Sequence, residues 1–470
     1  MNIEIPAIFT VYFLLLLTIA YTVSRKIKSS EEFILGGRST NFFVTAIALN
    51  ASDMSQWLFL AFPAVVYSTG LIRFWEMVGI VLFMFLNWQF VAPKLRRETQ
   101  KFNAVTLFSY FEKRFKDNSG TIRILTSLVS VVFFVFYISA GLIALGKLFE
   151  CAFGLQYEIG ILIGLGIAVI YTIIGGFVAV AWCDFFQGLF AITMLLFVPL
   201  VGLYSIGGWS AIVQAAQAKG VSLSIIPARS QIWDVIWLIF IWGPGYFGQP
   251  QLLSFFMGIK DPKKIKYAKA LSFTWQTVSL FASALIGLIS LVYFHNGDET
   301  IFIQLTKLLF PPLIAGIILC AIIAATLSTL DSYILTAGSA IAQDVYKKII
   351  NKDASSNKIV LVSRIFSFLI PAIALVIALE KNQTIYSLIK YSWSGMGSAF
   401  GPLVIASLYG KNTNKYGAIA GILTGSLVAA VFPYLKTDIP ELVPGFIAGY
   451  LAIYIVSLIT RATGTSKSLK

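Results

Sequence analysis

Apolar residues form long runs along this chain, and short polar segments separate them. A bilayer core about 30 Å thick is crossed by about 20 predominantly apolar helical residues. The pattern therefore predicts an all-α polytopic membrane protein with thirteen transmembrane helices. The predicted spans are 6–23, 43–70, 75–93, 124–149, 158–176, 184–208, 231–256, 272–295, 309–343, 360–380, 385–409, 416–435 and 443–460.

Two of these spans are interrupted by polar and helix-breaking residues. The first break is Ala-Leu-Asn-Ala-Ser-Asp-Met-Ser-Gln-Trp at 48–57, and the second is Trp-Gly-Pro-Gly-Tyr-Phe-Gly-Gln-Pro-Gln at 242–251. An unpaired backbone group in hydrocarbon costs several kcal/mol, so irregular backbone at membrane depth indicates a protein-lined polar cavity. A Pro-kinked packing helix is the alternative for the second break. A matching pair of breaks is typical of the solute and ion site of a secondary transporter.

The positions of the breaks also predict an internal repeat. Residues 43–208 and 231–409 each contain five spans, and each half begins with its broken helix. Because five is odd, the second half enters the membrane from the opposite side, which makes the repeat inverted. One extra helix at 6–23 precedes the repeats, and two extra helices within 416–460 follow them, all in one transmembrane domain of residues 1–470.

Composition and charge support a membrane protein and orient it. Hydrophobic residues make up 58% of the chain and the mean hydropathy is +0.84. Of the 35 Lys and Arg, 26 lie in one set of alternate loops and the tail, and six lie in the other set. The positive-inside rule then places the N-terminus outside and the C-terminus in the cytoplasm of a cell (inner or plasma) membrane protein. The net charge of +14 therefore indicates contact with anionic lipid and not with nucleic acid.

Few residues are suited to catalysis or to a resident cofactor. The chain has one His and three widely separated Cys, without metal-ligand spacing. We expect no catalytic residues, no enzyme activity and no cofactor.

The first break carries a charge at membrane depth. Asp53 there needs a partner or a wet cavity, because a charged group is costly inside a membrane. The alternative role is an N-cap of the second half-helix. If the backbone unwinds here, the carbonyl groups of Ala51 and Met54 are free to coordinate a hard cation, which prefers oxygen ligands.

The ninth span carries a stripe of oxygen ligands. Ala325, Ser328, Thr329 and Ser332 share one helix face, with Asp331 beside it. Such hydroxyls line an ion site or bond back to their own helix and its neighbours. Asp184, at the start of the sixth span, is a third acidic candidate, and its alternative is a charge favoured by the helix dipole.

In the second break, aromatic and polar side chains stand among glycines and prolines. Trp242, Tyr246, Phe247 and Gln249 offer aromatic walls and polar tips, and the glycines let a ligand approach the backbone. The candidates for binding the solute are Trp242, Tyr246, Gln249 and Pro250, together with Ser55 and Gln56 of the first break.

Several sequence motifs are spread over nearly the whole chain. They are Ala51-Ser-Asp-Met-Ser-x-Trp57, Gly176-Phe-x-Ala-Val-x-Trp-x-Asp184 with Gln187-Gly188, Trp242-Gly-x-Gly-Tyr-Phe-Gly-Gln-Pro250, Ala324-Ala-x-x-Ser-Thr-Leu330, Asp344-x-Tyr346 and Ala399-Phe-Gly-Pro402. Together they resemble the sodium:solute symporter family, most closely its sodium/proline symporters. The resemblance implies a LeuT-like inverted-repeat fold and import by alternating access, with Na⁺ as the coupling ion and the only metal expected.

The resemblance also implies roles for individual residues. It implies a main Na⁺ site of the Ala51, Met54 and Ala325 carbonyls with the Ser328 and Thr329 hydroxyls. Asp53 would be needed for coupling, and Trp242, Tyr246 and Pro250 match positions tied to proline binding. In relatives with a second Na⁺ site, the ligand positions match Asp184, Ser328, Asp331 and Ser332 of this chain.

The first broken helix departs from the proline pattern. Proline symporters have small residues, chiefly Gly, where this chain has Gln56, Ala61 and Ala64. The leading hypothesis is Na⁺-coupled import of a small amino acid, L-proline first. The alternatives are another small carboxylate or zwitterion, or a membrane-embedded sensor or channel. The expected partners are the solute, Na⁺ and the lipid bilayer.

Overall fold

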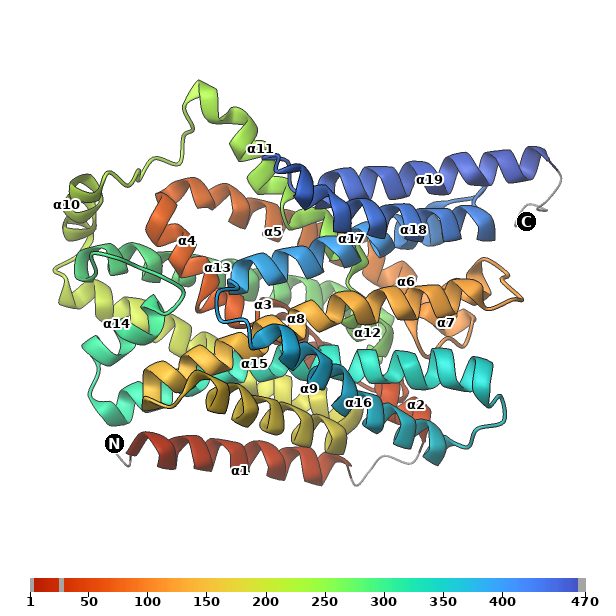
Figure 1. Ribbon diagram of the computed structural model, residues 1–470, viewed down its shortest axis with the longest axis horizontal. Helices are drawn as coiled ribbons and strands as arrows, with labels where there is room; N and C mark the ends of the chain where they lie inside the picture. The colour runs from red at the N-terminus through yellow and green to blue at the C-terminus, as the bar shows by residue number, and fades with distance from the viewer. Residues whose placement is uncertain (1–3, 25–28, 464–470) are drawn as a thin grey trace.

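The computed structural model describes residues 4–24 and 29–463, and every regular element in those two ranges is helical. The long helices run roughly along the longest axis of the molecule (Figure 1). They are α1 (Glu4–Ser24), α8 (Thr121–Phe153), α9 (Tyr157–Ser205), α13 (Ile265–Tyr293), α15 (Pro312–Ser339), α16 (Ser356–Ala378), α17 (Ile385–Tyr409), α18 (Lys415–Val431) and α19 (Leu442–Ala462).

Shorter helical segments connect or extend the long helices. They are α2 (Ser30–Leu35), η1 (Gly36–Arg38), η3 (Gly70–Arg73), α5 (Phe74–Leu86), η4 (Asn87–Val91), α6 (Ala92–Lys101), α7 (Leu107–Arg114), α10 (Trp209–Lys219), η5 (Arg229–Gln231), η7 (Pro262–Lys264), α14 (Ile301–Leu309), η8 (Ala340–Ile350) and η9 (Phe432–Leu435).

The first predicted break is present, but it begins only at Ser55, because residues 48–54 of the predicted stretch still belong to a helix. It separates α3 (Phe42–Met54) from the turn η2 (Gln56–Leu58) and from α4 (Ala61–Thr69). Ser55, at the break, has a φ of +49°, in the region that favours glycine. Its hydroxyl accepts a hydrogen bond from the Trp57 amide at 3.1 Å, which stabilises the turn locally.

The second break is present as well, between α11 (Ile232–Phe240) and α12 (Pro250–Gly258), with η6 (Gly243–Gly248) between them. Pro250 begins α12, because a missing amide proton costs nothing in the first turn. A Cβ at Gly245 would lie 2.1 Å from Trp393 Nε1, so this glycine lets the broken backbone pack directly on α17.

A third interruption divides α9. Gly176 has φ +59° and ψ −178°, which are not helical, so α9 consists of two helices that meet there. The predicted spans 158–176 and 184–208 fall on either side of it.

Helix length and composition support a multi-pass membrane protein. Within residues 4–24 and 29–463, eight helical stretches are long and apolar enough to cross a membrane, and shorter apolar helices cover 7–19, 42–54 and 232–248. The count of thirteen spans stays a prediction. The basic residues at 25–28 and 464–470, which contribute to the predicted charge asymmetry, lie outside the described residues.

A buried ionic cluster joins three elements on the side predicted to be cytoplasmic. Asp344 of η8 accepts hydrogen bonds from Arg123 Nε of α8 at 2.5 Å and from the Thr106 hydroxyl at 2.9 Å. Arg123 also pairs with Glu112 of α7 at 3.1 Å, and Lys348 of η8 pairs with the same carboxylate. The Asp344-x-Tyr346 motif therefore supplies a structural anchor between α7, α8 and η8.

Candidate functional site

Asp53 lies in the last turn of α3 and is almost fully buried. Its Oδ2 accepts hydrogen bonds from the Tyr246 hydroxyl at 2.8 Å and from Gln276 Nε2 at 3.4 Å. Its Oδ1 has no hydrogen-bond partner among the described residues. The two breaks are therefore joined directly, through the carboxylate of one and the phenol of the other.

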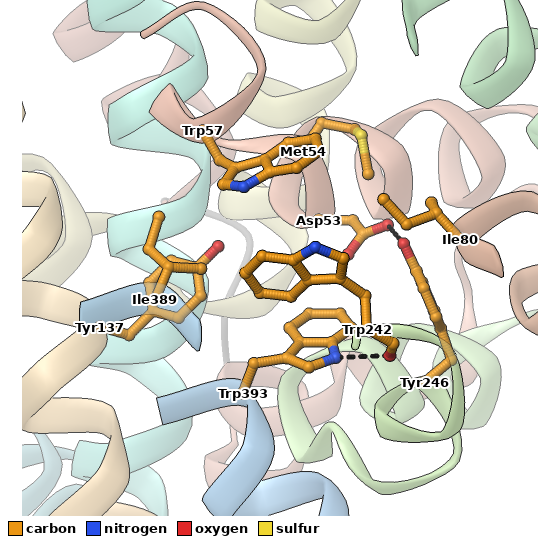
Figure 2. Close-up of a pocket in the computed structure, with 9 residues that line it drawn as sticks. All are labelled: Asp53, Met54, Trp57, Ile80, Tyr137, Trp242, Tyr246, Ile389 and Trp393. Atoms are coloured by element: carbon orange, nitrogen blue, oxygen red, sulfur yellow. Dashed lines mark hydrogen bonds between the residues drawn. The ribbon is translucent and has the colours of Figure 1, made fainter. Parts of the chain in front are cut away.

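A small cavity adjoins this carboxylate (Figure 2). The cavity has room for about one water molecule. An amino acid therefore fits only if the lining side chains move apart. Most of the lining is aromatic or aliphatic, and it consists of Asp53, Met54, Trp57, Ile80, Tyr137, Trp242, Tyr246, Ile389 and Trp393.

The aromatic walls of this cavity are held by one another and by backbone carbonyls. Trp393 Nε1 of α17 donates to the Trp242 carbonyl at 2.8 Å (Figure 2). The Tyr246 and Trp393 rings meet edge-on with centroids 5.0 Å apart, as do those of Trp57 and Trp242 at 5.6 Å. Edge-to-face pairs are favourable arrangements of aromatic rings. The cavity thus has an organised apolar wall opposite one carboxylate.

Oxygen atoms converge next to the cavity, where α3 packs on α15. The Ser328 hydroxyl lies 3.0 Å from the Ala51 carbonyl oxygen, and the Thr329 hydroxyl lies 3.5 Å from it. Both hydroxyls also lie 3.1 Å from the Ala325 carbonyl of their own helix. Because α3 ends at Met54, the Ala51 carbonyl lacks the helical amide that normally follows four residues later.

These oxygens are a suitable ligand set for a hard cation, which takes carbonyl and hydroxyl ligands. The Ser328 and Thr329 hydroxyls lie within hydrogen-bond distance of a carbonyl on their own helix and of one on α3. Bonding back to α15 and lining an ion site are therefore compatible roles for this stripe. Met54, the remaining predicted ligand, is buried and lines the cavity beside Asp53.

A second acidic group is buried between α9 and α15. The Ser332 hydroxyl lies 3.5 Å from Asp184 Oδ2, and neither oxygen of Asp331 has a hydrogen-bond partner in the part of the chain that is described. Asp184 and Asp331 are fully buried, and no salt bridge within residues 4–24 and 29–463 involves them. Two buried carboxylates without a countercharge are costly unless they are protonated or bind a cation.

The sequence gives only weak signals for the neighbours of these acidic residues. Gln187, one turn after Asp184, donates to the Tyr12 hydroxyl of α1 at 3.2 Å. Gln276, which holds both Asp53 and Tyr246, is a polar residue within the apolar span 272–295. A lone amide in an apolar helix is the signal for both glutamines, but it does not identify their partners.

Other predicted solute-binding residues lie outside the lining of the cavity. Gln249 Nε2 donates to the Gly245 and Trp393 carbonyls at 3.2 and 3.1 Å, so it ties the second break to α17. Pro250 borders a different small cavity near Ser254. The Ser55 hydroxyl accepts from the hydroxyl of Tyr137, a lining residue, at 3.1 Å.

Gln56 is fully buried, and neither polar atom of its side chain has a hydrogen-bond partner among the described residues.

Across the described residues, no group of three or more His, Cys, Asp or Glu is arranged to hold a metal ion.

Comparison with known proteins finds one matching family model and several similar proteins. The model of the sodium:solute symporter family matches residues 33–425. The high-affinity proline transporter PutP of Bacillus subtilis (strain 168) is 37% identical over 456 residues, or 95% of this chain and 96% of that protein. A sodium/proline symporter of Salmonella typhimurium is 36% identical, and the match covers 97% of this chain and 93% of that protein.

Solved structures show the same architecture. A Na⁺-coupled sialic acid symporter in a substrate-bound, outward-open state has a TM-score of 0.83 at 18% identity, covering 97% of this chain and 98% of that one. MhsT in complex with L-phenylalanine has a TM-score of 0.58 at 13% identity, covering 88% of this chain and 97% of that one. Both have the LeuT-like fold, which confirms the predicted fold class.

Proposed function

Because this chain belongs to the sodium:solute symporter family, we propose that it imports L-proline across the cell membrane together with Na⁺. The observation that carries the proposal is the meeting of the two broken helices at one small cavity, where Tyr246 binds Asp53 at 2.8 Å. Relatives named as proline transporters match this chain at 35–37% identity over at least 95% of its length, which supports proline as the solute.

The proposed main Na⁺ site consists of the Ala51, Met54 and Ala325 carbonyls with the Ser328 and Thr329 hydroxyls. Its support is the 3.0 Å approach of Ser328 to Ala51 across the interface of α3 and α15. An ion bound there holds α3 against α15 and so favours the form in which Asp53 and the aromatic walls are ready for the solute. This link between the ion and the shape of the cavity is the basis of coupling.

A second Na⁺ at Asp184, Ser328, Asp331 and Ser332 is proposed because a cation neutralises the two buried carboxylates. The solute is proposed to contact Trp242 and Tyr246 in the cavity wall. Ser55, Gln249 and Pro250 would act around it, through Tyr137, α17 and α12.

The topology is proposed on the distribution of positive charge. It has thirteen spans, with the N-terminus outside and the C-terminus in the cytoplasm. The inverted repeats are residues 43–208 and 231–409, preceded by the helix at 6–23 and followed by the two helices within 416–460. Alternating access then consists of rocking one part of these repeats against the other around the central site.

Another small carboxylate or zwitterion is the second candidate solute. The observation that favours it is Gln56, which stands where proline symporters have a small residue. Its amide is buried and has no hydrogen-bond partner within the described part of the chain. A polar group added near the first break changes which solute satisfies the site.

Counterflow in proteoliposomes distinguishes proline from the other candidate solutes. Vesicles loaded with unlabelled proline, in Na⁺ buffer, are expected to accumulate labelled proline transiently, and a panel of other loaded amino acids is expected to do so less. Exchange with another zwitterion and none with proline would contradict proline as the solute.

A further inference from the structure

Glu76 is a fully buried carboxylate that the sequence does not single out. It lies in the first turn of α5, and its side chain has no exposed surface. Its Oε2 pairs with Arg73 at 2.9 Å. Its Oε1 accepts from Trp242 Nε1 at 2.5 Å and from the Tyr386 hydroxyl at 3.1 Å. Three donors on three separate segments therefore share one carboxylate.

These three segments meet beside the proposed solute cavity. Trp242 lines the cavity, and its ring meets the Tyr386 ring edge-on at 5.5 Å. Arg73 keeps 19% of its side chain exposed, whereas the side chain of Glu76 has no exposed surface. Arg73, Glu76 and Trp242 therefore form a chain of contacts that leads from a partly exposed side chain to the cavity. In the proposed topology these contacts lie on the extracellular side.

The start of α17, which carries Tyr386, is also held by a carboxylate. Glu299 accepts from the Ile385 and Tyr386 amides at 3.1 and 3.0 Å and pairs with Lys147 at 2.7 Å. A carboxylate at a helix N-terminus satisfies free amides and suits the helix dipole. The outer end of α17 is therefore fixed by Glu299, and Glu76 then connects it to Trp242 and α5.

We propose that Glu76 is a positioning residue of the transport cycle: it holds Trp242 over the solute cavity and seals the outer path between α5, the second break and α17. The proposal rests on the proposed function and topology. Opening the cavity to the outside separates Glu76 from Trp242, from Tyr386 or from both. A bound solute that holds Trp242 in place therefore favours the state in which the outer path is closed.

The chemistry of the site makes Glu76→Gln a sharp test. Two carboxylate oxygens accept all three donors, whereas glutamine offers one oxygen and turns an NH₂ group toward the other donors. Tyr386→Phe removes only one of the three hydrogen bonds and is the milder variant. The matched control is Glu150→Gln, because Glu150 pairs at 2.7 Å with Lys381 in an exposed ion pair on the same side.

The readout is labelling of Ile389→Cys, a cavity position on α17, by a membrane-impermeant thiol reagent added to whole cells. Cys151, Cys183 and Cys320 are first replaced by serine. In Na⁺ buffer without solute, Glu76→Gln is expected to raise the labelling rate at least fivefold and Tyr386→Phe about two- to threefold. Glu150→Gln is expected to leave it unchanged.

Transport adds a second readout. The KM for proline is expected to rise at least fivefold in Glu76→Gln, with a smaller change in kcat. The reason is that Trp242 is no longer held in the cavity wall, whereas the proposed Na⁺ site is unchanged. Equal labelling rates in the parent and in both Glu76→Gln and Tyr386→Phe would overturn the proposal. Labelling is measured without solute, so this result is independent of whether the protein carries proline.

Discussion

Removing the Ser328 hydroxyl is expected to weaken Na⁺ binding while leaving solute binding nearly unchanged. The hydroxyl lies 3.0 Å from the Ala51 carbonyl, and neither residue lines the solute cavity. Ser328→Ala keeps the Ala51 and Ala325 carbonyls, so the proposed ion site loses one oxygen and retains its backbone ligands. The side chain is fully buried, so water does not readily replace the lost oxygen.

The size of the effect follows from the energy of one polar contact with a charge. Hydrogen bonds to charged groups contribute about 1.5–3 kcal/mol. Since each 1.4 kcal/mol is tenfold in affinity, the half-saturating Na⁺ concentration is expected to rise between about tenfold and about a hundredfold. The KM for proline at saturating Na⁺ is expected to change less than about threefold.

The assay is initial proline uptake into proteoliposomes against Na⁺ concentration, at saturating proline. Thr326→Ala is the matched control, because this buried hydroxyl of the same helix bonds the Ile322 carbonyl of α15 at 2.7 Å. Coincident Na⁺ curves for Ser328→Ala and the parent would refute the assignment. An equal shift in Thr326→Ala would refute it as well, since the effect would then belong to the helix and not to the site.

Two further predictions concern the other buried charges. If Asp331 and Asp184 bind a second ion, Asp331→Ala should lower the Hill coefficient for Na⁺ from near two toward one; a coefficient of one in the parent protein would exclude that site. Arg123→Ala leaves Asp344 and Glu112 without their shared cation and is expected to destabilise the fold by about 3–5 kcal/mol, the usual cost of an unpaired buried charge. Thermal unfolding of the purified protein measures this loss, and an unchanged midpoint would contradict the anchoring role of the cluster.

The positions of the long apolar helices and of both breaks were predictable from local sequence. Glycine, proline and polar residues interrupt apolar runs at 48–57 and 242–251, and the helical backbone breaks within both stretches. The stripe of Ser328 and Thr329 was predictable for the same reason, because helical spacing alone places both hydroxyls on one face. Local sequence also indicated that Asp53 needs a partner, since a charge at membrane depth is costly.

The partners themselves depend on tertiary packing, which local sequence does not describe. Tyr246 and Gln276 reach Asp53 from segments far along the chain. Glu76 lies at the edge of a predicted span, where an exposed charge is ordinary. Its burial comes from Trp242 and Tyr386, which are distant in sequence and cover it only in the folded protein.

Proline uptake driven by a Na⁺ gradient alone is the most direct measurement of the proposed function. Proteoliposomes containing the purified chain are diluted into Na⁺, K⁺ or choline buffer, with and without an inside-negative potential. Each Na⁺ that enters gains about 2.3 kcal/mol per 100 mV. Uptake is therefore expected only in Na⁺ buffer and is expected to rise with the potential. Equal proline uptake in choline or K⁺ buffer would contradict Na⁺-coupled import.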